Sequence, residues 1–138
     1  MNIRTVLACA LALSLGAACS SALNFTPTAT ALTVGADLKV RAEIDAAQHL
    51  TRVRVRAENL APPGRLMPEG RLFVVWARAN ANTTWVRVGT LVYDTDDRDG
   101  ELNATVPFTS FELMVTAESS AEVPTPSDKV VVTQRVGS

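Results

Sequence analysis

The sequence predicts an all-β protein, an antiparallel β-sandwich of about seven to eight strands. Nearly every segment after Leu32 has apolar residues at alternate positions and is rich in β-branched residues. No stretch of a dozen residues keeps an apolar stripe at helical spacing. Turns rich in Asn, Asp, Gly and Pro separate the segments at short intervals. Together these observations favour two packed sheets over a helical or mixed fold.

The first two strands with a clear pattern are 37–44 and 51–59. Each has apolar side chains on one face and charged side chains on the other, so each is expected to have one face in water. The apolar set comprises Leu38, Val40, Ala42, Ile44, Val53, Val55 and Ala57. The charged face of 51–59 carries Arg52, Arg54 and Arg56, a ladder that could receive carboxylates or phosphates. A solvent face paired with Glu43 or Asp45 is the favoured interpretation.

The segment 71–79 is apolar on both faces, which is typical of a central strand covered on each side. Further strands are expected at 83–94, 100–108, 110–119 and 128–136. The connection 61–70 contains three prolines and suits a crossover between the sheets. The predicted core includes Leu72, Val74, Trp76, Val86, Val88, Leu113 and Val115.

The N-terminal residues 1–18 have the layout of a secretory signal peptide. Arg4 is the one charge, and an uncharged run from Thr5 ends in Gly16, Ala17 and Ala18. A membrane-spanning helix needs about 20 apolar residues, so a permanent span is disfavoured. Cys9 would be removed with this signal.

Cys19 follows "LGAA" directly, and this stretch resembles the lipobox of bacterial lipoproteins, although Leu15 stands one place earlier than usual. The resemblance implies that Cys19 is lipidated and becomes the mature N-terminus, with 19–31 as a short tether and 32–138 as the sandwich. Ser20 in place of an aspartate implies the outer membrane. The alternative is ordinary cleavage at an A-x-A-like site, which would leave a soluble periplasmic or secreted domain.

Charge and residue counts narrow the function classes. Without residues 1–18 the chain has 12 basic and 14 acidic side chains, a net charge of −2, which argues against nucleic-acid binding. His49 is the only histidine, and Cys19 would be the only cysteine left, so we expect no metal site and no internal disulfide. A lone histidine in a turn also gives a nucleophile no activating base. We therefore expect no cofactor and no enzyme activity.

The carboxylates of "DTDDRDGE", residues 94–101, could surround calcium, but their spacing does not match an EF-type loop. A solvated hairpin tip is the favoured interpretation. Trp85, Arg87 and Tyr93 could form an aromatic platform for a sugar if their faces are exposed. Packing in the core is the alternative for these aromatic rings.

A family resemblance covers residues 59–132. The pieces "NLAPPG", "EGRLFVVWAR", "VGTL", "DGELNATV", "FELMVTAES" and "VPTPSDKVVV" occur in the order found in the extracytoplasmic domain of anti-sigma-K factor type proteins. The chain resembles that domain, which implies an Ig-like β-sandwich outside the cytoplasm. The cytoplasmic zinc-binding segment is not among the matching pieces, so the resemblance implies no anti-sigma activity.

The sequence therefore predicts a lipid-anchored, non-catalytic module of the cell envelope, with an envelope protein or a glycan as its partner. The alternative is a ligand-sensing or carbohydrate-binding module.

Overall fold

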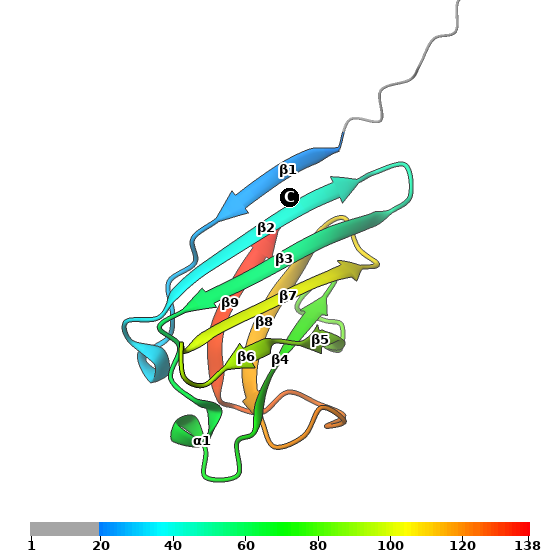
Figure 1. The fold of residues 1–138 in the computed structure, drawn as a ribbon. Helices are drawn as coiled ribbons and strands as arrows, with labels where there is room; N and C mark the ends of the chain where they lie inside the picture. The colour runs from blue at the N-terminus through cyan, green and yellow to red at the C-terminus, as the bar shows by residue number, and fades with distance from the viewer. Residues whose placement is uncertain (1–19) are drawn as a thin grey trace, which may run out of the picture.

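The computed structural model describes residues 20–138 and consists of two antiparallel sheets packed face to face (Figure 1). The predicted all-β sandwich is confirmed, with nine strands in this part of the chain. The predicted signal peptide and Cys19 lie outside the described residues.

The first sheet has five strands in the order β1-β2-β3-β7-β6. Their bounds are Ser21–Phe25 for β1, Asp37–Asp45 for β2, Leu50–Glu58 for β3, Asp99–Val106 for β7 and Val92–Asp94 for β6. The second sheet has four strands in the order β5-β4-β8-β9. Their bounds are Val86–Thr90 for β5, Leu72–Arg78 for β4, Phe111–Glu118 for β8 and Val130–Val136 for β9.

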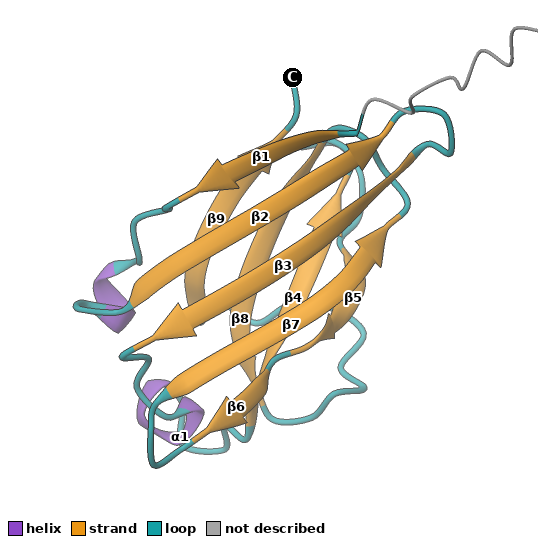
Figure 2. Cartoon of the chain, turned by 45° about the horizontal axis from the view of Figure 1, so that its top comes forward, coloured by secondary structure: helices purple, strands orange, loops and turns teal. Residues whose placement is uncertain are grey.

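The strand order is that of an immunoglobulin-like sandwich with one added edge strand. Without β1, the order β2-β3-β7-β6 facing β5-β4-β8-β9 matches the A-B-E-D and C′-C-F-G sheets. Figure 2 shows the first sheet in front of the second, with the strands of both sheets turned only moderately from one another. This arrangement leaves the outer face of the first sheet open.

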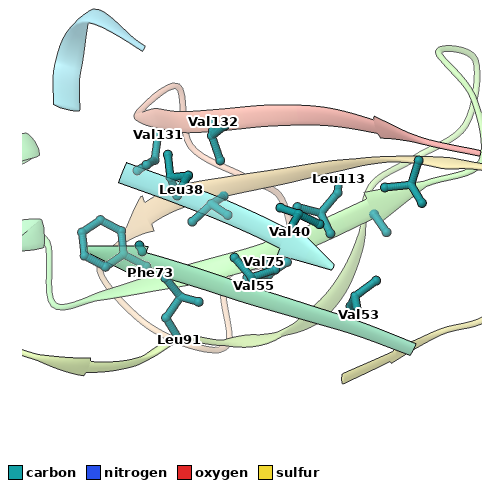
Figure 3. Close-up of a cluster of buried hydrophobic side chains, with 14 of the residues drawn as sticks. Leu38, Val40, Val53, Val55, Phe73, Val75, Leu91, Leu113, Val131 and Val132 are labelled. Carbon is teal, nitrogen blue, oxygen red and sulfur yellow. The ribbon is translucent and has the colours of Figure 1, made fainter. Parts of the chain in front are cut away.

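The core lies between the sheets, where alternate residues of both sheets interdigitate (Figure 3). Val40 and Val55 of the first sheet meet Phe73, Val75 and Leu113 of the second, and all five are almost fully buried. The alternation that the sequence shows in 37–44 and 51–59 therefore directs the apolar side chains inward, and the charged ones stay in water.

The predicted core is correct in part. Leu113 and Val115 are in the core between the sheets, and Val88 packs against it. Val74 and Trp76 are buried, but in a second cluster on the outer face of the four-stranded sheet, with Leu72 beside it. The prediction was wrong for Val86, which is 45% exposed on the edge strand β5.

Three connections cross between the sheets: β3 to β4, β5 to β6 and β7 to β8. The proline-rich segment after β3 contains the short helix α1, Pro63–Leu66, and leads to β4 in the other sheet, as predicted. The segment 83–94, expected as one strand, is two: β5 in the second sheet and β6 in the first. Leu91 lies between them, 3% exposed, and its N–H donates to the Phe73 carbonyl at 3.0 Å.

The segment 19–31 was expected to be a tether that merges into an edge strand. In the structure, β1 begins at Ser21 and pairs with β2 over its whole length, from Ser21 opposite Ile44 to Phe25 opposite Val40. Leu23 and Phe25 pack against the core. A 3₁₀ turn, η1, follows at Ala31–Thr33. The sheet therefore begins directly after Ser20.

Candidate functional site

Two of the three proposed ligand-binding residues lie on the outer face of the four-stranded sheet. There Val74, Trp76 and Met114 form a buried cluster, the outer cluster, against which Trp85 packs. The guanidinium of Arg87 lies 5.7 Å from the centroid of the Trp76 ring and donates to the Val123 carbonyl. Arg87 therefore ties β5 to the loop between β8 and β9 across the outer cluster.

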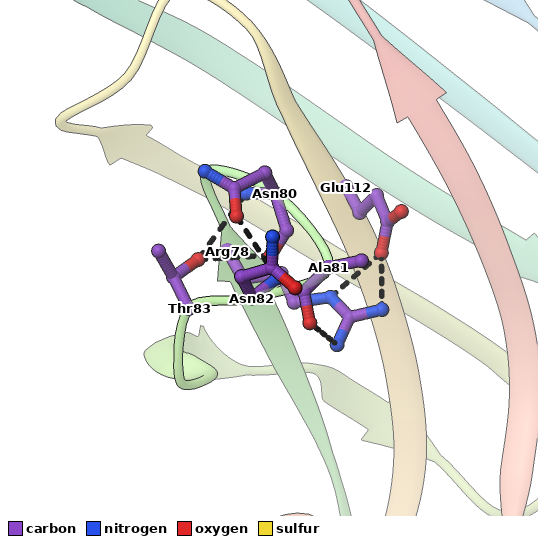
Figure 4. Close-up of polar contacts among 6 residues, drawn as sticks. All are labelled: Arg78, Asn80, Ala81, Asn82, Thr83 and Glu112. Carbon is purple, nitrogen blue, oxygen red and sulfur yellow. Dashed lines mark hydrogen bonds and ion pairs between the residues drawn. The ribbon is translucent and has the colours of Figure 1, made fainter.

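The guanidinium of Arg78 lies over one face of the Trp85 ring. The guanidinium carbon of Arg78 lies 4.3 Å from the ring centroid, within the range of a cation–π contact. Arg78 is held there by Glu112, whose Oε2 accepts a hydrogen bond from Nε of Arg78 at 2.7 Å and forms an ion pair with its Nη2, also at 2.7 Å (Figure 4). A turn in which Asn80 and Thr83 bond each other carries the chain back towards Trp85. Trp85 is thus half-buried with Arg78 over one face of its ring, and Arg87 is exposed beside it.

A buried carboxylate, which the sequence patterns did not single out, stabilises the same face. Glu118 is 2% exposed and accepts hydrogen bonds from the Thr116 hydroxyl at 2.6 Å and the Ser127 N–H at 2.9 Å. The Thr116 hydroxyl in turn accepts the Trp76 indole N–H at 2.9 Å. All the buried polar side-chain atoms in the described part have a partner. This series of hydrogen bonds, from Trp76 to Ser127, has a structural role, since it fixes the 119–129 loop on the outer cluster.

Tyr93 lies in the other sheet. Its ring packs edge-on against Phe73, with centroids 5.2 Å apart, and its hydroxyl donates to the Leu60 carbonyl. Burial raises the pKa of Tyr93, although the nearby Arg98 acts in the opposite direction. The phenol thus remains a protonated donor at neutral pH. Tyr93 supports the core and is not brought together with Trp85 and Arg87.

The open face of the five-stranded sheet gathers cations at its centre. The hairpin of β2 and β3 places Lys39 opposite Arg56 and Arg41 opposite Arg54. We call these four residues the cation quartet. Carboxylates stand at its rim and make ion pairs: Arg41 with Glu43 at 3.1 Å, Arg54 with Glu101 at 3.3 Å and Arg56 with Glu58 at 3.5 Å.

The sequence singled out only part of this face. It identified Arg54 and Arg56 but not Lys39 and Arg41 as their neighbours. The signal that could have found them is the hairpin itself, because a turn centred on 46–49 fixes which residues of the two strands stand opposite. Arg52 does stand opposite Glu43, as expected, but the ion pair of Glu43 is with Arg41.

The acidic segment 94–101 is the tip of the β6–β7 hairpin. The Asp94 carboxylate accepts the backbone N–H groups of Asp96 at 2.9 Å and Asp97 at 3.2 Å, which closes the turn. Among residues 20–138 no three Cys, His, Asp or Glu side chains are placed to hold a metal ion together. His49 lies in the exposed β2–β3 turn with a φ of 55°.

Within the described part of the chain, no helix has the length and apolar character needed to cross a membrane. Comparison with known proteins finds no matching family model, no matching curated protein and no matching solved structure. The resemblance to the anti-sigma-K factor domain therefore stays a prediction from the sequence.

Proposed function

We propose that this protein is a lipid-anchored module of the bacterial cell envelope, held by Cys19 at the outer membrane and acting through its surfaces without catalysis. The apolar segment that ends in "LGAAC" supports the anchor. The several acyl chains of a bacterial lipoprotein cysteine would supply durable binding, because each buried CH₂ contributes about 0.8 kcal/mol.

The observation that carries the proposal is the start of β1 at Ser21. One residue, Ser20, separates Cys19 from the first residue of an edge strand that is paired throughout with β2. A lipid on Cys19 would thus be joined almost directly to a rigid sheet. The domain would be held at the membrane surface in a restricted range of orientations, which suits an interaction or structural module.

The chemistry of the described surface also favours a non-catalytic role. Several arginines and glutamates on the open face of the first sheet form exposed ion pairs, and His49 is exposed in a turn. A partner in the envelope is therefore expected to be bound rather than converted.

Membrane fractionation of cells that express the full chain tests the anchor. We expect the wild-type protein to sediment with membranes, to resist extraction by 1 M salt and to be released by detergent, because salt screens electrostatic contacts and not acyl insertion. Cys19→Ser removes the acceptor sulfur and should abolish lipid labelling. Cys9→Ser is the matched control, since it removes the other cysteine and should leave labelling and fractionation unchanged.

A wild-type protein found in the soluble periplasmic fraction or the medium, with no lipid label, would contradict the proposal. That outcome would favour the alternative of a soluble periplasmic or secreted domain.

A further inference from the structure

The cation quartet combines two like-charged pairs that stand directly opposite each other. Like charges at opposed positions of an antiparallel pair destabilise a sheet, and here two such pairs are adjacent, Lys39 with Arg56 and Arg41 with Arg54. The strands carry carboxylates at both ends of this block, so the same face offered places for opposite charges. The quartet therefore places four positive charges together, although selection for the stability of the sheet alone would favour alternating charges at these positions.

A hollow of about 270 Å³ lies over the quartet, beside β1. Eight residues line it, and four of these are the cations of the quartet, whereas none is a carboxylate. Asn24 of β1 contributes its amide oxygen, which lies 3.5 Å from Arg41. The hollow therefore presents guanidinium and ammonium donors together, which is the donor set that phosphate oxygens prefer.

The ion pairs at the rim do not close this site. The side chains of Arg41, Arg54 and Arg56 keep 49%, 58% and 55% of their surface exposed. Exposed pairs of this kind contribute little to stability and exchange readily with other anions. Lys39 has no ion pair with another described residue.

The quartet lies close in chain distance to the proposed anchor. Asn24 stands opposite Arg41, and from Cys19 to Asn24 the chain makes five steps, at most about 17 Å when extended. Figure 2 shows β1, β2 and β3 side by side on the open face of the molecule. A domain anchored at Cys19 can therefore bring this face to the level of the lipid phosphates.

We propose that the cation quartet binds the phosphate head groups of the membrane to which Cys19 is anchored, so that the open face of the first sheet lies against the bilayer. This inference rests on the proposed anchor for its location. Each surface cation adds to the attraction of an anionic leaflet, and several together would select, among the orientations that the short link to Cys19 allows, the one with this face on the bilayer.

Arginine footprinting tests the inference on the purified full-length product. The protein is mixed with vesicles of phosphatidylcholine, or of phosphatidylcholine and phosphatidic acid at 4:1, and treated with phenylglyoxal. We expect modification of Arg41 and Arg54 to slow by about fivefold or more on the anionic vesicles. Arg65 and Arg71 are internal controls, because both are exposed away from this sheet and should react equally on the two vesicles.

A double variant tests whether the quartet causes the protection, and inorganic phosphate tests whether the site prefers the membrane to free phosphate. In Arg41→Gln/Arg54→Gln, the protection of Arg56 on anionic vesicles should be lost, whereas Arg65→Gln/Arg71→Gln should keep it. Equal modification rates on the two vesicle types would overturn the inference. Equal protection by inorganic phosphate without vesicles would also overturn it, because the site would then take free phosphate. Flotation of the protein with the neutral vesicles tests the lipid anchor alone, because these vesicles carry no net negative charge. Loss of flotation would contradict the anchor, whereas flotation without arginine protection on the anionic vesicles would contradict only the inference about the quartet.

Discussion

At the scale of single residues, Trp76 combines two kinds of stabilisation. Its ring is 1% exposed in the outer cluster, and its indole N–H donates to the Thr116 hydroxyl. The Thr116 hydroxyl donates onward to Glu118, which holds the Ser127 N–H. The residue thus joins the sheet to the loop that covers it.

Trp76→Ala should lower the free energy of unfolding by about 3–5 kcal/mol, because it leaves a cavity in the outer cluster. Chemical denaturation measures this change. Val86→Ala is the matched control, since Val86 is 45% exposed on the neighbouring strand and should cost less than about 0.5 kcal/mol. A loss below about 1 kcal/mol for Trp76→Ala would mean that the ring is not buried as described.

The burial of Trp76 could be predicted from the sequence, but its side of the sheet could not. Residues 71–79 are apolar at nearly every position, and a pattern without alternation does not tell which residues face the other sheet. The same difficulty affected Trp85 and Tyr93. They belong to one predicted strand in the sequence, yet Trp85 directly precedes β5 and packs on the outer cluster, whereas Tyr93 lies in β6 of the other sheet.

At the scale of elements, alternation was informative where one face of a strand is in water. The strands β2 and β3 were predicted within one residue at each end, because charged and apolar residues alternate through most of both strands. The division between β5 and β6 carried no such signal. Thr90 and Leu91 continue the β-rich pattern with no proline, yet the chain changes sheets there, with Leu91 buried in the core.

The connection that carries α1 depends on a close approach of two backbone segments. A Cβ on Gly70 would stand 2.3 Å from the Pro63 carbonyl oxygen and 2.7 Å from its carbon. A Cβ on Gly64, in α1 itself, would meet nothing closer than the Gly70 carbonyl oxygen at 3.6 Å. These two glycines in one short segment thus have different steric requirements.

Gly70→Ala should destabilise the protein by about 1–3 kcal/mol, because backbone must move to admit the methyl group. Gly64→Ala is the control and should be neutral or stabilising by up to about 1 kcal/mol, since alanine favours the helix. Thermal unfolding of the two variants measures both changes. Equal stability of the two would show that α1 and Gly70 do not pack as described.

At the scale of the whole molecule, the sandwich has two different outer faces. The four-stranded sheet is partly covered by the 119–129 loop and by Arg78 and Arg87, whereas the five-stranded sheet is open and charged. The sequence predicted the charge on 51–59 but not the quartet, because cross-strand neighbours depend on hairpin register. The proposed anchor joins the molecule at the edge of the open sheet.

The most direct test of the anchored sandwich is the intact mass of the protein extracted from membranes, together with the mass of its N-terminal peptide. We predict an N-terminal cysteine, Cys19, that carries the mass of attached acyl chains, followed by the unmodified sequence from Ser20. A mature protein that begins at Cys19, Ser20 or Leu23 with no added mass would contradict the account.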